Sequence, residues 1–294
     1  MSGTTFYIVD VFAERKYAGN QLAVVLDGQR FTTEEMQRIA KEMNYSETTF
    51  VMSEEPADGA FPVRIFTPEE ELPFAGHPTL GTAYIIQKEI LRQRVSTVTL
   101  QLGVGPITVS FTYNGDEPDK LSMRQNEPSF GPVYDHRLFA EMLSLEIDDV
   151  DQLLPVETVS TGVPAVVIPI NSLPALKTCK VNAELYWKFT ENSMAKMLLA
   201  FCREPQEEGN DLHMRVFVDY FGIPEDPATG SAAGDLTGYL LKHGLYGDAF
   251  RLRAEQGYSI GRPSILELGG TKEVNRFRID VGGRCFLVAK GELL

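Results

Sequence analysis

The chain of 294 residues carries 41 acidic and 27 basic side chains, which gives a formal net charge of −14. This acidic balance argues against a nucleic-acid partner, which usually requires a basic face, and against an anionic membrane surface. It leaves room for a small anionic metabolite, because a helix N-terminus can bind a carboxylate whatever the overall charge. No stretch approaches the ~18 apolar residues of a membrane-spanning helix.

The N-terminal sequence and the cysteines both bear on the compartment. The first residues, MSGTTFYIVDVF, lack the basic segment of a signal peptide and read directly as a strand, so we expect no secretory leader. Cys179, Cys202 and Cys285 have neither metal-ligand spacing nor an even number for disulfide pairing. Cys202 and Cys285 adjoin apolar runs and are expected in the core. We therefore expect a cytoplasmic protein with no metal site.

The first half of the chain predicts strands, two helices and a hairpin. Thr32 and Glu35 form a capping-box pattern at the start of the helix expected over residues 32–43. A second helix is expected from Pro78 to Ile90. The strands are expected at residues 6–12, 22–26, 48–52 and 63–66, and the hairpin at residues 98–111.

The second half repeats this mixture of elements after a polar segment rich in Pro and Gly, residues 127–135. This segment predicts a boundary, and we expect one domain at residues 1–128 and a second at residues 129–294. Helices are expected at residues 136–145 and 230–243. Strands are expected at residues 165–170, 196–201 and 214–218 and in the two alternating segments 277–281 and 285–289.

A weak internal repeat links the two halves. Arg64-Ile-Phe66 and Arg215-Val-Phe217 each open a strand, a Pro follows nine residues after each Arg, and a Gly-rich turn and a helix come next. With a shift of 149 residues, Pro78 matches Pro227, Gly81 matches Gly230, and His77 falls opposite Asp226. The pattern predicts two similar lobes, each contributing one polar turn to a site in the cleft between them.

Individually, the polar residues of these turns have ordinary structural explanations. Glu47 reads as a solvated loop acid, as most glutamates are. His77, next to Pro78 at a helix start, is more often structural than catalytic. Asp226 before a Pro is a common helix-capping residue, and Asn20 after a Gly is an ordinary turn signal.

Helix capping and turn formation do not explain the run of small residues that follows Asp226. The small residues from Thr229 to Gly234 would let a backbone approach a ligand closely. The sequence has no P-loop, no dinucleotide fingerprint, no HExxH, no CxxC and no G-x-S-x-G elbow. What remains is cofactor-free acid–base chemistry by Glu47, His77 and Asp226.

Taken together, these motifs resemble a known family. The chain is similar over essentially its full length to the phenazine-biosynthesis PhzF-like proteins. It departs from their pattern at Gln21, where they usually have Pro. The motifs that carry the resemblance are Asp10-Val-Phe12 with Gly19-Asn20, Ser46-Glu47-Thr48, Phe66-Thr-Pro68 with Gly76-His-Pro78, Glu225-Asp-Pro-Ala-Thr-Gly-Ser231 and Glu255-Gln-Gly257.

The resemblance implies an α+β, diaminopimelate-epimerase-like fold. Two pseudo-symmetric lobes would each wrap a curved, mostly antiparallel sheet around a central helix. Epimerases and proline racemases of this fold use a cysteine at the start of each central helix, but the corresponding turns here, Phe74–His77 and Pro227–Gly230, contain no Cys. Racemisation by two thiols is therefore not expected.

The resemblance also implies a function. PhzF-like proteins isomerise a small carboxylated metabolite by moving a proton, without a cofactor. Mapped here, Glu47 is the general acid/base, with its pKa raised in a closed cleft, and His77 and Asp226 orient the substrate. The remaining expected substrate-binding residues are Asn20, Ser46, Gly76, Gly230 and Ser231.

The resemblance further implies a homodimer. The alternative is a non-catalytic member of the same fold, which binds a metabolite or a protein partner. The combination of Glu47, His77 and Asp226 favours the enzyme, because a binding module needs no acid/base.

Overall fold

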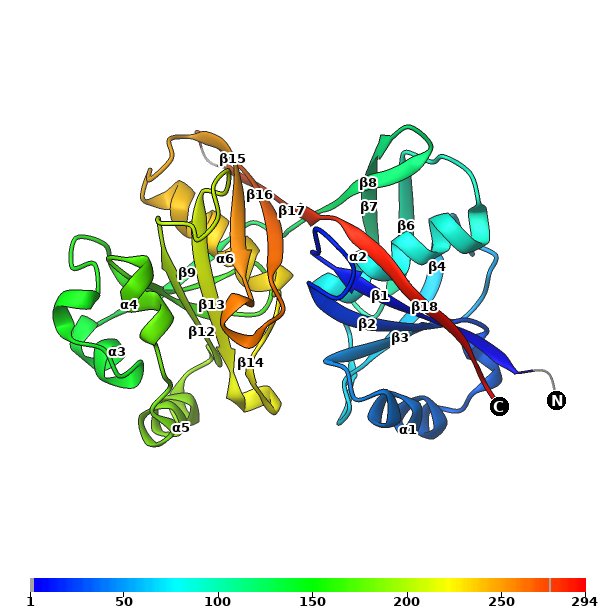
Figure 1. Cartoon of the computed structure of the whole chain (residues 1–294), viewed down its shortest axis with the longest axis horizontal. Coiled ribbons are helices and arrows are strands. Elements are labelled where there is room, and N and C mark those ends of the chain that lie inside the picture. Colours follow the sequence, from blue (N-terminus) through cyan, green and yellow to red (C-terminus); the bar gives the residue numbers. More distant parts are fainter. Residues whose placement is uncertain (1–2, 275) are drawn as a thin grey trace. The chain divides into compact units, whose positions relative to one another are not determined.

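The computed structural model describes residues 3–274 and 276–294. It divides the chain into two compact units (Figure 1). The first unit holds the residues up to Arg124 together with Gly282–Leu294, and the second holds Gln125–Val281. Among the described residues, no helix combines the length and the apolar character needed to cross a membrane.

The first unit is a mixed sheet with one helix at its centre. Its strands follow the order β18-β1-β2-β3-β4-β6-β7-β8, with β5 on β4, and only the β2–β3 and β4–β6 pairs are parallel. Helix α2 packs against β18, β1, β2 and β3 and also against β6, β7 and β8, so the sheet must curve around it (Figure 1). The strands are β1 (Thr4–Val11), β2 (Asn20–Val25), β3 (Glu47–Val51), β4 (Phe61–Phe66), β5 (Glu71–Leu72), β6 (Thr97–Leu102), β7 (Gly105–Asn114), β8 (Glu117–Arg124) and β18 (Cys285–Leu293), and the helices are η1 (Gly28–Arg30), α1 (Thr33–Met43), α2 (Gly76–Ile85) and η2 (Ile86–Leu91).

The second unit repeats the plan. Its strand order is β9-β10-β11-β12-β13-β15-β16 with β14 on β13, and again only two pairs, β11–β12 and β13–β15, are parallel. Helix α6 packs against β10, β11, β12 and β16. The strands are β9 (Ser129–Tyr134), β10 (Val156–Ser160), β11 (Ala165–Pro169), β12 (Met197–Cys202), β13 (Leu212–Val218), β14 (Ile223–Glu225), β15 (Ala249–Gln256), β16 (Ser264–Glu273) and β17 (Arg276–Gly283), and the helices are α3 (His136–Met142), η3 (Ile147–Asp149), α4 (Leu173–Thr178), α5 (Ala183–Asn192), η4 (Asp219–Phe221), α6 (Gly230–Lys242) and η5 (Tyr258–Ile260).

Most expected elements are present, and the structure also contains elements that the sequence analysis did not predict, among them α4, α5, β10, β15 and β16. The capping box of α1 is confirmed, because Thr32 and Glu35 exchange side-chain and backbone hydrogen bonds. The helix expected from Pro78 begins at Gly76 and changes from α to π geometry at Ile86. The segment expected as a boundary contains β9, which pairs with β10. The last strand, β18, pairs with β1, so the C-terminal segment lies in the first unit and not in the second.

The structure also changes the alignment of the internal repeat. Pro78 lies inside α2, whereas Pro227 precedes α6, so the shift of 149 residues is wrong. The correct pair is Pro73-Phe-Ala-Gly76 with Pro227-Ala-Thr-Gly230, a shift of 154 residues that aligns the first residues of both helices. In each unit a glycine touches this proline: a Cβ on Gly103 would lie 2.9 Å from Pro73 Cα, and one on Gly257 would lie 2.5 Å from the Pro227 carbonyl oxygen. His77 therefore corresponds to Ser231, and Asp226 corresponds to Leu72.

An arginine–glutamate fork occurs in both units. Arg215 binds Glu225 through Nε–Oε1 at 3.0 Å and Nη2–Oε2 at 2.7 Å, and Arg64 binds Glu71 at 2.7 and 2.6 Å. The Arg215 side chain is 9% exposed, and its Nη1 also donates to the carbonyls of Leu176 and Cys179 at the end of α4. Both arginines stack on the Phe two residues further on, which explains the repeated Arg-x-Phe pattern.

We predict that Arg215→Met lowers the free energy of unfolding by about 3–5 kcal/mol, measured by urea denaturation. The substitution leaves the buried Glu225 carboxylate without its cation, which is the costly way to break a buried ion pair. Arg64→Met is the matched control. Its side chain is 28% exposed, so the loss should stay near ~1 kcal/mol. Equal losses for the two variants would contradict this account.

Candidate functional site

The first unit brings Asn20, Glu47 and His77 together. Glu47 is the first residue of β3 and Asn20 the first of β2, and these parallel neighbours pair with Leu22 opposite Glu47. His77 is the second residue of α2, which packs on both strands. Glu47 Oε2 lies 3.3 Å from His77 Nε2, and Asn20 Nδ2 lies 3.3 Å from His77 Nδ1. Ser46 precedes β3, and Gly76 opens α2.

His77 is a neutral imidazole in this setting. Its side chain is 5% exposed, and burial lowers its pKa to about 3, while a hydrogen bond with the Gln21 backbone acts weakly in the other direction. Burial disfavours the charged ring because water no longer solvates it. The contact between His77 and Glu47 is therefore one between a neutral ring and a carboxyl group.

The second unit holds Asp226, Gly230 and Ser231. Asp226 follows β14, and Gly230 and Ser231 are the first two residues of α6. Thr229, the N-cap residue of α6, donates its hydroxyl to Asp226 Oδ2 at 2.5 Å. Asp226, Thr229 and Ser231 are half-buried, so the turn is partly accessible to solvent.

Both central helices offer backbone donors at their starts. In the described part of the chain, no side chain caps α2 at Ala75 or α6 at Thr229. The first N–H groups of a helix have no partner within it, and they can bind an anion. Gly76 and Gly230 are the first residues of these two helices.

Two residues of this site had no role in the sequence prediction. Gln256, at the end of β15, binds Thr229 and the backbone of Asp226. Its motif was noted, but a glutamine at the end of a strand gives no local signal of a partner 27 residues away in the chain. Thr229 was noted only as one of a series of small residues.

The cysteines are core residues, as expected for Cys202 and Cys285. Cys179, Cys202 and Cys285 are all buried, and burial raises the pKa of the Cys202 thiol to about 11 and that of Cys179 to about 12. A thiol that stays protonated at neutral pH is a poor nucleophile. None of the three has the properties of a reactive cysteine.

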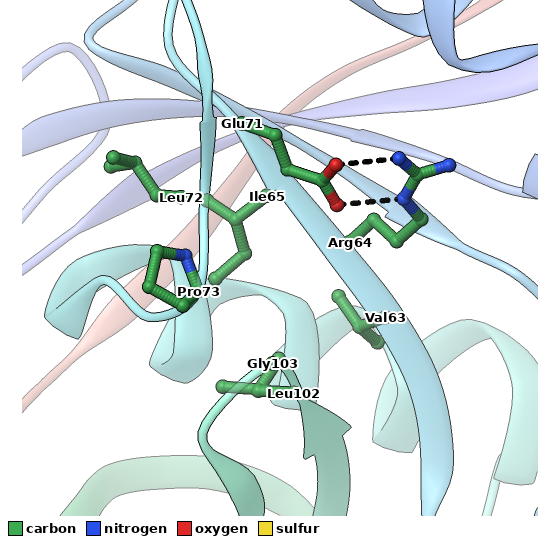
Figure 2. A pocket seen from close by; sticks show the side chains of 8 residues that line it. All are labelled: Val63, Arg64, Ile65, Glu71, Leu72, Pro73, Leu102 and Gly103. Carbon is green, nitrogen blue, oxygen red and sulfur yellow. Dashed lines mark hydrogen bonds and ion pairs between the residues drawn. The ribbon is translucent and has the colours of Figure 1, made fainter.

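A cavity of about 340 Å³ opens in the first unit, away from these residues (Figure 2). Figure 2 shows the Arg64–Glu71 fork at its side, and none of the expected site residues lines it. Its walls are Val63, Arg64, Ile65, Glu71, Leu72, Pro73, Leu102 and Gly103.

We predict that His77 makes stability depend on pH below neutrality. Its pKa is about 6.5 in the unfolded chain and about 3 when folded, so only the unfolded chain binds this proton between those values. The contribution of the neutral, buried His77 to the free energy of unfolding is complete above pH ~6.5. It falls as the pH drops towards 3, by up to about 1.4 kcal/mol per pH unit. Urea denaturation between pH 7 and 4 should therefore give a steeper loss for the wild type than for His77→Gln. His136→Gln, at a half-buried position, is the control, and parallel curves for the wild type and His77→Gln would contradict the prediction.

Comparison with known proteins identifies the family. The chain matches the family described as "Phenazine biosynthesis-like protein" over residues 9–291. An uncharacterized isomerase of Pasteurella multocida is 33% identical over 98% of this chain and 93% of its own length. Trans-2,3-dihydro-3-hydroxyanthranilate isomerase of Pseudomonas chlororaphis is 31% identical over 98% of this chain and 99% of its own.

Solved structures agree with this match. The crystal structure of the Bacillus anthracis phenazine biosynthesis protein of the PhzF family has a TM-score of 0.90 and 30% identity, covering 100% of both chains. A probable proline racemase from Agrobacterium radiobacter has a TM-score of 0.65 over 99% of this chain and 93% of its own, at 11% identity, which shows the fold alone. The expected α+β, epimerase-like fold is confirmed. With matches along nearly its whole length, the chain belongs to the phenazine-biosynthesis-like PhzF family of isomerases.

Proposed function

We propose that this protein isomerises a small carboxylated metabolite, of the type of trans-2,3-dihydro-3-hydroxyanthranilate, by moving a proton between two carbons. The observation that carries the proposal is the contact between Glu47 and the buried, neutral His77 at the start of α2. The name of the Pseudomonas chlororaphis relative supports the substrate class. The substrate would occupy a cleft to which both units contribute.

In the proposed mechanism Glu47 is the only group that transfers the proton. Its carboxylate takes a proton from an acidic C–H, becomes a carboxylic acid, and returns that proton to a different carbon of the same molecule. Atoms and charge balance without a cofactor or a co-reactant. A positioned carboxyl group of this kind contributes roughly 10²–10⁴-fold to a rate.

Other residues would hold the substrate and stabilise charge. The first amides of α2 and α6, at Gly76, Gly230 and Ser231, would bind the carboxylate and the negative charge that develops as the proton leaves. Asp226 would accept hydrogen bonds from the substrate's polar substituents. Asn20 fixes the ring of His77, which in turn orients the carboxyl group of Glu47.

We predict that Glu47→Gln lowers kcat by about two to four orders of magnitude with trans-2,3-dihydro-3-hydroxyanthranilate as substrate. Incorporation of deuterium from heavy water into recovered substrate and product should fall in parallel, because both report the same C–H step. The dissociation constant of the unreactive aromatic analogue 3-hydroxyanthranilate should change little, since Gln retains most of the hydrogen bonding. The analogue's affinity is measured by calorimetric titration.

Glu117→Gln, on an exposed carboxylate of the same unit, is the matched control and should leave turnover unchanged. Full turnover in Glu47→Gln would reject the mechanism. Tight binding of metabolites by a wild type that neither turns them over nor exchanges their protons would favour a binding protein instead.

We further predict that Asp226→Asn weakens binding of 3-hydroxyanthranilate by roughly tenfold or more. A hydrogen bond to a charged group contributes about 1.5–3 kcal/mol, and the amide loses that charge. The same titration measures it. An unchanged dissociation constant would remove Asp226 from the proposed binding residues.

A further inference from the structure

The side chain of Gln256 is fully buried beneath the turn that carries Asp226. Its Oε1 accepts from Thr229 N at 3.0 Å, and its Nε2 donates to the Asp226 carbonyl at 2.8 Å and to Thr229 Oγ1 at 2.9 Å. Thr229 Oγ1 in turn donates a hydrogen bond to Asp226 Oδ2. One amide thus binds the backbone on both sides of Pro227 and, through one hydroxyl, the carboxylate itself.

The orientation of this amide is determined by its partners. The N–H of Thr229 can only donate, and the carbonyl of Asp226 can only accept, so a flipped amide would lose both bonds. With Nε2 donating to Thr229 Oγ1, the hydroxyl proton is directed to the carboxylate. Gly257 reinforces the arrangement, because at φ 76° its backbone lies so close to Pro227 that a Cβ would come within 2.5 Å of the carbonyl oxygen.

The first unit has the corresponding Pro-x-x-Gly turn without this network. By the repeat of 154 residues, Asp226 corresponds to Leu72, Thr229 to Ala75 and Gln256 to Leu102. All three positions are polar in one unit and apolar in the other. A Pro-x-x-Gly turn can therefore lead into a central helix without the network, which indicates that the network serves the carboxylate.

We infer that Gln256 and Thr229 are positioning residues, which hold the Asp226 carboxylate in a fixed orientation beside the first amides of α6. The inference rests on the proposed role of Asp226 in binding substrate. Without the hydrogen bond from Thr229 the carboxylate loses one of the contacts that orient it, and a substrate would have to order it further on binding. A proton donated to one carboxylate oxygen also favours the ionised form of the group.

The first test needs no ligand. Asp226 is followed by carboxyl ¹³C NMR during pH titration of the full chain, with its signal assigned by Asp226→Asn. In Thr229→Ala and in Gln256→Leu, each of which installs the residue of the first unit, the midpoint should rise by about half a unit or more. Thr229→Ser should retain the wild-type midpoint. Gln87→Leu, which removes another buried glutamine, is the matched control and should also leave it unchanged.

The second test is a double-mutant cycle on the dissociation constant of 3-hydroxyanthranilate. Gln256→Leu and Thr229→Ala should each weaken binding about tenfold in the wild type and less than twofold in Asp226→Asn, because contacting residues couple. Thermal melting accompanies every variant. Unchanged NMR midpoints, or equal effects in both backgrounds, would overturn the inference.

The outcomes separate the two proposals. Coupled effects in a protein whose deuterium exchange does not depend on Glu47 would sustain the inference and reject the mechanism. Additive effects with exchange that does depend on Glu47 would reject the inference and leave the mechanism standing. If 3-hydroxyanthranilate does not bind, the NMR midpoints of Asp226 alone decide whether the inference about Gln256 and Thr229 stands.

Discussion

A helix buried on every side constrains the rest of this fold. All residues of α2 from His77 to Ile85 are buried, and so are all but two of the thirteen in α6. Strands pack this closely because small residues line the contacts: a Cβ on Gly81 would lie 2.6 Å from Leu22 Cδ2. A helix in such a position can bring few polar groups to solvent except at its ends. The first backbone N–H groups, which have no acceptor within the helix, are the polar groups that each central helix offers at its N-terminus.

Polar side chains inside these helices fix their position in the sheet. Thr82 in α2 shares a hydrogen bond of 2.8 Å with Thr49 in β3. Asp235 in α6 accepts from the backbone N–H of Thr161 at 2.6 Å and from its hydroxyl at 2.9 Å, and burial raises the pKa of this carboxyl well above its usual range. Because a buried polar group is costly without partners, such bonds allow one axial position for each helix. By holding each helix in place, these hydrogen bonds also fix the position of its first backbone amides.

The sequence predicted what local signals determine. The capping box at Thr32 was correct, as were most strands. It placed Glu47 and His77 in one unit, where they are in contact. The prediction from sequence failed where contacts between residues far apart in the chain determine the structure. The spacing of Pro and Gly is compatible with shifts of both 149 and 154 residues, and the starts of α2 and α6 together with the contacts of Gly103 and Gly257 distinguish them. The role of Gln256 was likewise invisible, because its partners lie across the sheet.

Comparison of the two units separates scaffold from chemistry within a single chain. The arginine–glutamate fork, the Pro-x-x-Gly turn and the glycine beneath it recur in both, although their local sequences differ. These shared features fix the strand that leads into the central helix and the point at which the helix begins. The residues that differ, His77 against Ser231 and Leu72 against Asp226, stand at the same positions of that frame. A turn repeated in both units can therefore carry a histidine in one and an aspartate in the other, because neither side chain is shared by the two turns.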